Sequence, residues 1–84
     1  MFDVEKFKSN LGGQSTKELV DYIIKNKICL KEDAVNVIIK SRLERNKWPK
    51  PSNAKKIVEY FLRIGFIKEN GDSVELNNNF KPLK

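Results

Sequence analysis

The segment SNAKKIVEYFLRIGFIKENGDSVEL, residues 52–76, has a helical apolar pattern before Gly65 and a strand-like pattern after it. Before the glycine, apolar side chains recur every three or four residues, which predicts an amphipathic helix over residues 53–64. Ser52 or Asn53 is expected to cap this helix, and the glycine suits the left-handed position that ends one. Its buried face would consist of Ala54, Ile57, Val58, Phe61 and Leu62.

The residues after the glycine predict a β-hairpin. Asn70-Gly71 separates two short runs, and this dipeptide favours a tight turn in which both residues have positive φ. Val74 and Leu76 alternate with polar residues, which is typical of a strand with one buried face. The remaining tail is polar apart from Phe80, which we expect to fold back onto the core.

Upstream of the helix, the sequence KWPKPS, residues 47–52, predicts a change of direction. Pro49 and Pro51 lack a backbone N–H and disfavour helical geometry at the residue before them. A helix predicted over residues 32–46 therefore has to end before these prolines. We expect the single indole, Trp48, to pin the connection to the core, with stacking on a base or a partner as the alternative.

Three further elements are expected nearer the N-terminus. A helix over residues 16–26 would begin at a capping box made by Ser15 and Glu18. Residues 28–30 favour a short strand, in which Cys29 is a small buried side chain without chemistry. A short helix precedes these elements and is indicated by Asp3, Val4, Phe7, Leu11 and the pair Gly12-Gly13.

The net charge of +6 is concentrated in one part of the chain. Residues 40–63 contain eight cationic and two acidic side chains, an excess of six, which leaves nine of each sign elsewhere. Such a cluster suits a polyanion-binding surface, because neutralised phosphates release condensed counterions. A solvated lysine-rich face is the alternative. The eight cations are Lys40, Arg42, Arg45, Lys47, Lys50, Lys55, Lys56 and Arg63.

The order of three helices and a hairpin, with the basic amphipathic helix directly before the hairpin, resembles the winged helix-turn-helix superfamily. The resemblance covers about residues 15–78 and is carried best by residues 52–76. It implies a mainly α fold with a small β-hairpin (α+β), made of three core helices, a two-stranded wing padded by residues 28–30, and a short N-terminal helix. Residues 1–84 would form a single domain with a flexible C-terminal tail over residues 78–84.

The third helix of this superfamily typically lies in the DNA major groove, so the resemblance implies that helix 53–64 inserts there. The start of the helix adds the partial positive charge of its backbone. The hairpin tip, residues 69–72, carries two carboxylates and is expected to contribute little. The expected DNA-binding residues are Lys47, Lys50, Ser52, Asn53, Lys55, Lys56, Tyr60 and Arg63.

Two of the neighbouring side chains have an alternative role. Tyr60 can donate its hydroxyl to a phosphate or lie as an amphipathic residue over the edge of the core. Glu59 can pair with Lys55 or Arg63, each four residues away.

These features favour a transcriptional regulator of a microbe, virus or plasmid that binds double-stranded DNA. Because one such module makes few contacts, we also expect a homodimer. Two alternatives stay open: a winged-helix adaptor in a replication or transcription assembly, and a module that binds RNA or ribosomes.

Other classes of protein have little support from the sequence. The chain has no histidine, no pair of carboxylates set for acid-base work and no glycine-rich phosphate loop, so we expect no enzyme, metal, cofactor or small-molecule ligand. No apolar run approaches the ~20 residues that span a bilayer, and the N-terminus is too charged for a secretory signal. We therefore expect a cytoplasmic protein, associated with the nucleoid if it binds DNA.

Overall fold

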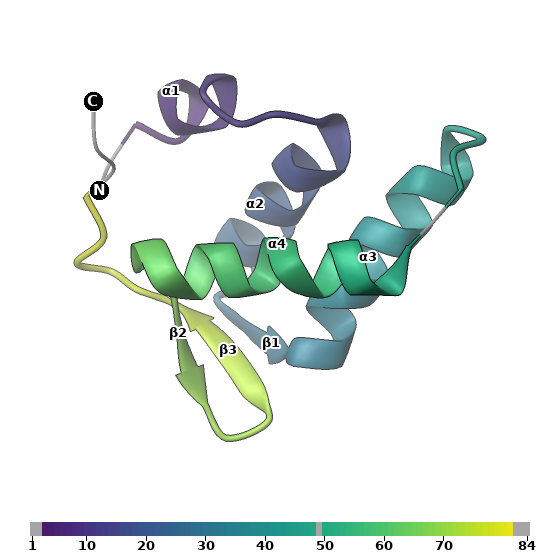
Figure 1. Ribbon diagram of the computed structural model, residues 1–84. Coiled ribbons are helices and arrows are strands. Elements are labelled where there is room, and N and C mark those ends of the chain that lie inside the picture. The colour runs from purple at the N-terminus through teal and green to yellow at the C-terminus, as the bar shows by residue number, and fades with distance from the viewer. Residues whose placement is uncertain (1–2, 49, 82–84) are drawn as a thin grey trace.

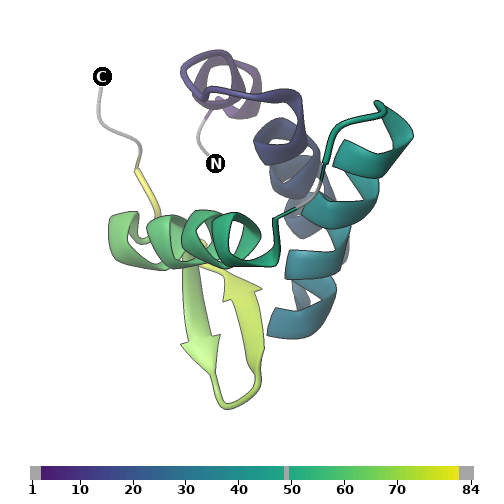
Figure 2. The same cartoon turned by 45° about the vertical axis from the view of Figure 1, so that its right-hand side comes forward.

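The computed structural model describes residues 3–48 and 50–81, which form a mixed α/β fold. In both ribbon views, helix α4 lies between α1 on one side and the β2–β3 hairpin on the other (Figure 1, Figure 2). In chain order, the described elements are α1 (Val4–Ser9), α2 (Gln14–Asn26), β1 (Ile28–Leu30), α3 (Lys31–Glu44), α4 (Pro51–Ile64), β2 (Ile67–Asn70) and β3 (Ser73–Leu76).

The strands form a three-stranded antiparallel sheet in the order β1-β3-β2. Residues 28–30 are a strand, as predicted, and they pair with β3, which makes them the third strand of the described sheet beside the hairpin. Two backbone bonds extend this pairing at its ends: the N–H of Leu76 donates to the C=O of Lys27 (2.7 Å), and that of Lys31 donates to Asp72 (2.9 Å). Strand β1 therefore ties the hairpin to the start of α3.

The hairpin turn lies one residue later than predicted. Asn70 pairs with Ser73, so the two turn residues are Gly71 and Asp72, and only the glycine has a positive φ (63°). The cause is the register, which places Ile67 opposite Leu76 so that both are buried. The predicted alternation in β3 is confirmed by its pattern of burial.

The core is built on the apolar face of α4, as predicted. Ala54, Val58 and Phe61 are buried, and Ile57 and Leu62 pack partly buried against the same cluster. Four phenylalanines meet at its centre, with neighbouring ring centroids 5.1 to 6.3 Å apart. They are Phe7, Phe61, Phe66 and Phe80.

The aromatic cluster also holds the start of the tail. Phe80 is only 7% exposed, which confirms that this side chain folds back onto the core. Its backbone N–H donates to the C=O of Asn77 (3.0 Å). Residues 82–84 of the tail, like Pro49 in the connection, lie outside the described residues.

Helix α4 ends at Gly65, as predicted, and the turn delivers the chain into β2. The glycine has a φ of 86°, which few other residues adopt without strain. Its N–H donates to Leu62 (3.2 Å), and the N–H of Phe66 donates to the C=O of Phe61 (3.1 Å). The two phenylalanine rings lie 5.2 Å apart, the apolar contact that usually accompanies this helix ending.

Helix α4 begins at Pro51, so the prediction that Ser52 or Asn53 caps it is wrong. Lys50 holds the cap position without a side-chain hydrogen bond, and Ser52 and Asn53 lie exposed in the first turn. Proline suits the first helical position because its φ is already helical and its missing N–H would have no partner there. By contrast, a side chain does cap α1, since the Asp3 carboxylate accepts from the backbone N–H of Lys6 (3.1 Å).

The predicted capping box of α2 is also wrong. The helix begins at Gln14, after Gly13, and no side chain caps it. Ser15 and Glu18 instead face α3, where they join a chain of hydrogen bonds. Arg45 Nη2 donates to Ser15 Oγ (2.6 Å), Ser15 donates to Ser41 Oγ (3.1 Å), and Ser41 donates to the Glu18 carboxylate. The bonds give these polar groups partners at a buried helix contact.

Helix α3 ends at Glu44, two residues before the predicted end. Asn46 has a left-handed φ of 56°, its N–H donates to Leu43 (3.0 Å), and the N–H of Lys47 donates to the C=O of Arg42 (2.8 Å). This pattern of bonds closes a helix and reverses the chain. The connection to α4, residues 45–50, therefore starts from a defined bend.

Candidate nucleic-acid interface

The solvent-facing side of α4, which we call the α4 ridge, carries most of the residues predicted to bind DNA. Their exposure follows from the spacing of the helix, because the core takes the opposite face. The ridge consists of Ser52, Asn53, Lys55, Lys56, Glu59, Tyr60 and Arg63, all of them exposed.

Among the residues that the structure describes, no carboxylate forms an ion pair with a cation of the ridge. The ion pairs among the described residues lie elsewhere, on α1 and α2 and at the sheet. The predicted pairing of Glu59 with Lys55 or Arg63 is absent from the described ion pairs, and the Arg63 guanidinium lies over the Tyr60 ring, 5.9 Å from its centroid. The ammonium and guanidinium groups are thus free to meet an anion.

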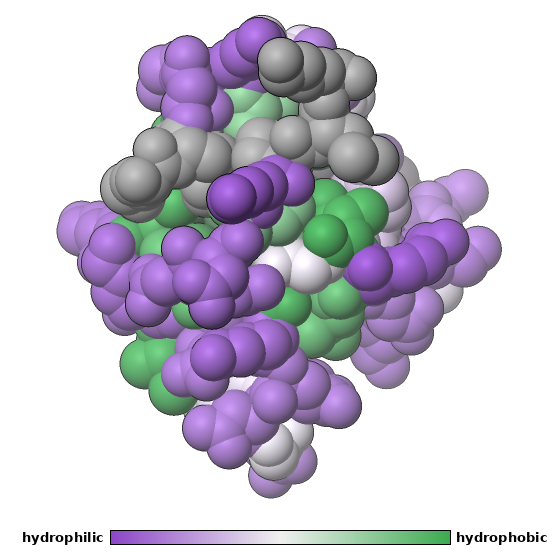
Figure 3. Space-filling model, turned by 90° about the vertical axis from the view of Figure 1, so that its left-hand side faces the viewer, coloured by the Kyte–Doolittle hydropathy of each residue, from purple (hydrophilic) through white to green (hydrophobic). Residues whose placement is uncertain are grey.

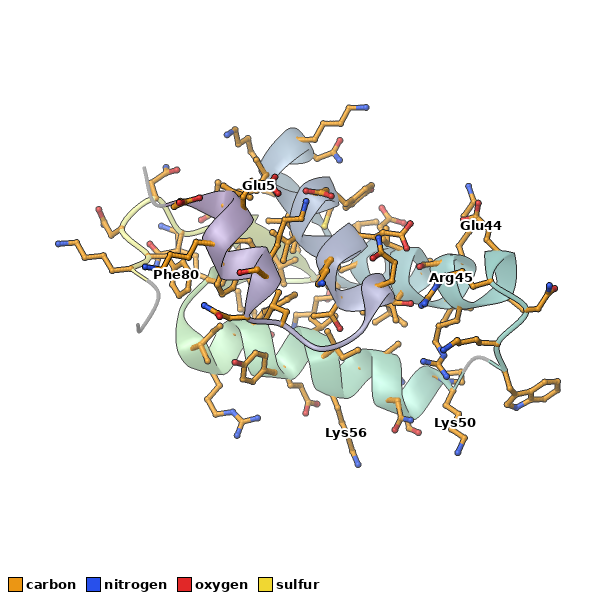
Figure 4. The ribbon with its side chains drawn as sticks, turned by 90° about the horizontal axis from the view of Figure 1, so that it is seen from above. Glu5, Glu44, Arg45, Lys50, Lys56 and Phe80 are labelled. Atoms are coloured by element: carbon orange, nitrogen blue, oxygen red, sulfur yellow. The ribbon has the colours of Figure 1, made fainter. Side chains whose placement is uncertain are left out.

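The connection adds two exposed lysines next to the ridge, Lys47 and Lys50. Figure 4 shows Lys50 and Lys56 extending from the same side of the molecule, whereas Glu44 extends from the opposite side. Lys50 and the ridge can therefore face a common surface, with the carboxylate at the end of α3 directed away from it.

Two of the three arginines in the basic segment have internal roles. Arg42 Nε donates to the C=O of Trp48 (3.2 Å), and Arg45 bonds Ser15 in the buried polar chain. Arg45 Nε is buried without a hydrogen-bond partner. Of these three side chains, only Arg63 belongs to the ridge, so the charge count in the sequence overstates the cations that a ligand can reach.

Trp48 does not pin the connection to the core, and that prediction is wrong. Trp48 is 80% exposed to solvent. The main chain is instead held by Arg42, which bonds the backbone at residues 47 and 48. Because the connection is fixed through its backbone, the indole is not needed as an anchor.

A groove of about 500 Å³ lies beside the ridge, between α3, α4 and β2. Val35, Val58 and Leu62 line it with apolar surface. The polar residues of its lining are Lys31, Glu32, Lys55, Glu59 and Glu69, and Lys31 forms an ion pair with Glu69. The lining therefore has three carboxylates and two ammonium groups, an excess of one negative charge.

On its other side, the ridge borders α1. Tyr60 is 41% exposed and lines two neighbouring hollows of about 210 and 290 Å³, both of which also include Asn10 and Leu11. Figure 3 shows hydrophobic surface between hydrophilic groups on the side of the molecule where α4 ends. Tyr60 thus lies at the border between the ridge and the hollows beside α1.

Cys29, in strand β1, is a free, partly buried thiol. Burial raises its pKa, and the nearby Asp33 carboxylate adds to the increase. Because the thiolate is the reactive form, this environment keeps the group protonated and unreactive.

The described residues include no cluster of His, Cys, Asp and Glu that could hold a metal ion. None of their helices is both long and apolar enough to cross a membrane. Comparison with protein-family models, curated proteins and solved structures finds no match.

Proposed function

We infer that the chain is a winged helix-turn-helix protein that binds double-stranded DNA through the α4 ridge and acts as a transcriptional regulator. The order helix, strand, helix, helix, hairpin from α2 to β3 supports this class of fold. The sheet order β1-β3-β2 agrees with a short strand that pads the wing. In this arrangement α4 is the helix that enters the major groove.

One observation carries the proposal: the exposed cations of the ridge and connection have no carboxylate partners among the described residues. Free, clustered ammonium groups are the feature that phosphate binding needs, since each contact releases counterions. The five cations concerned are Lys47, Lys50, Lys55, Lys56 and Arg63.

The dimensions of α4 suit this use. A helix of 14 residues is about 21 Å long, enough to cross a major groove of about 12 Å. Lys50 and Lys55 lie near its N-terminus, where the helix dipole also favours phosphate. Ser52, Asn53 and Tyr60 can donate hydrogen bonds to phosphates or base edges.

The proposal is tested by titrating a labelled DNA duplex of about two helical turns with the protein over a series of salt concentrations. Five phosphate contacts predict a slope of log affinity against log salt of about −4.5, at ~0.9 per contact. The double variant Lys55→Gln/Lys56→Gln should flatten the slope by about 1.8.

The matched control is Lys6→Gln/Lys25→Gln, which removes the same charge from exposed positions on α1 and α2. It should leave the slope nearly unchanged. No binding of the wild type at low salt, or equal slopes for the two double variants, would overturn the proposal.

A second candidate, a protein-binding adaptor, is favoured by the acidic groove between α3, α4 and β2. Its apolar lining and surplus of carboxylates suit a partner segment with apolar and basic side chains. Val35→Lys would obstruct this groove without substituting a residue of the ridge. If that variant loses a protein partner while Lys56→Gln/Arg63→Gln, two ridge positions outside the groove lining, keeps it, the adaptor function gains support over DNA binding.

A further inference from the structure

Trp48 is the one tryptophan of the chain, and it is more exposed than any other large hydrophobic residue described. At 80% it exceeds Leu43 (57%) and Ile28 (50%). An indole has a large apolar surface that is usually buried in a core or an interface. Packing of the core therefore does not explain the exposed indole on the α3–α4 connection, whereas contact with a ligand would.

The main chain that carries this indole is held in place. Asn46 adopts a left-handed φ of 56° that reverses the chain after α3. The N–H of Lys47 then donates to the C=O of Arg42 (2.8 Å), and Arg42 Nε donates to the C=O of Trp48 (3.2 Å). Arg42 thus bonds the main chain at both Lys47 and Trp48. The indole of Trp48 therefore projects from a fixed part of the backbone.

The charged residues near the indole in the sequence are mostly positive. Residues 40–56 contain seven cations and one carboxylate, Glu44, and two of the cations, Arg42 and Arg45, bond within the protein. Lys47 and Lys50 flank the indole in sequence, are exposed, and take no part in the described ion pairs. Glu44 extends from the side of the molecule opposite to Lys50 (Figure 4). A flat aromatic group among free ammonium groups suits a ligand with both a π-face and negative charge.

We propose that Trp48, Lys47 and Lys50 form a binding site for an unpaired nucleotide that adjoins the duplex held by α4. The base stacks on the indole, and the flanking phosphates contact the two ammonium groups. An unpaired base is required because both faces of a base inside a duplex are already covered by its neighbours. This inference rests on the proposed function, since the ridge holds the adjoining double-stranded part.

The test compares a blunt duplex with the same duplex extended by a short single-stranded thymidine tail. Because Trp48 is the sole tryptophan, its emission reports directly on the site and should be quenched when the tailed duplex binds. Trp48→Ala should weaken binding of the tailed duplex by about 5- to 150-fold, the range measured for one stacked base. Binding of the blunt duplex should stay unchanged.

Two further variants serve as controls. Trp48→Phe preserves a stacking ring and should retain most of the preference for the tailed duplex. Leu43→Ala removes another exposed apolar side chain and should leave binding of both duplexes unchanged. Equal affinity of wild type and Trp48→Ala for the tailed duplex, or emission unchanged on binding, would overturn the inference. Blunt-duplex binding would still support the proposed function in that case, whereas its absence in the wild type would contradict the proposed function itself.

Discussion

Replacing Phe61 with alanine is expected to lower the free energy of unfolding by about 3–5 kcal/mol, the usual cost of removing a buried aromatic ring. The side chain is fully buried, and its ring centroid lies 5.2 Å from that of Phe66 and 6.3 Å from that of Phe7. The cavity would therefore open where α4, α1 and the sheet meet.

Chemical denaturation monitored by circular dichroism measures this loss. A small domain is stable by only about 5–15 kcal/mol, so the variant should unfold at a much lower denaturant concentration. The neighbouring Tyr60 is 41% exposed, so Tyr60→Ala on the same helix should cost about 1 kcal/mol or less. Equal losses for the two variants would contradict the assignment of the α4 core face.

Reversing the charge of Lys55 and Lys56 is expected to weaken duplex DNA binding by at least about 100-fold. Each substitution by glutamate removes an attraction and places a carboxylate against phosphate, and every 1.4 kcal/mol lost is about tenfold in affinity. Both side chains are exposed, so stability should change by only about 0.5 kcal/mol per substitution. Fluorescence anisotropy with a labelled duplex, alongside thermal unfolding, separates the two effects.

The matched variant Lys6→Glu/Lys25→Glu changes the net charge by the same amount at positions outside the ridge. It should weaken binding far less, because only long-range electrostatics is altered. A similar loss in both variants would show that net charge alone drives binding and that the ridge is not the binding surface.

Features set by local periodicity could be predicted from the sequence. The apolar spacing of α4 identified its buried and exposed faces, and with them the candidate DNA-binding residues. Gly65 ended the helix because a left-handed φ there needs a glycine. The alternation of Val74 and Leu76 identified the buried face of β3.

Features that depend on contacts between distant segments could not be predicted. Ser15 and Glu18 match a capping box, but both side chains form hydrogen bonds with Ser41 instead. Ser41 is 26 residues from Ser15 in the sequence and lies close to it only because α2 packs on α3. Likewise, Lys31 and Glu69 meet beside the acidic groove because β1 and the hairpin form one sheet.

Trp48 shows why the candidate site was only partly predictable. A lone indole between a lysine and a proline usually anchors a loop, and the spacing of residues alone does not reveal that the Arg42 side chain holds the backbone instead. The charge of Arg42 alone predicts a ligand for polyanions. Its hydrogen bond to the connection depends on the path of the main chain, which the sequence pattern does not give.

The most direct test of the central claim is to follow the backbone amide signals of isotope-labelled protein by nuclear magnetic resonance during titration with duplex DNA. We predict that the largest shifts fall on the α4 ridge and the connection, at Lys50, Ser52, Lys55, Lys56 and Arg63. Largest shifts on α2 or on the outer strand β1, with little change along α4, would contradict the claim that this ridge binds DNA.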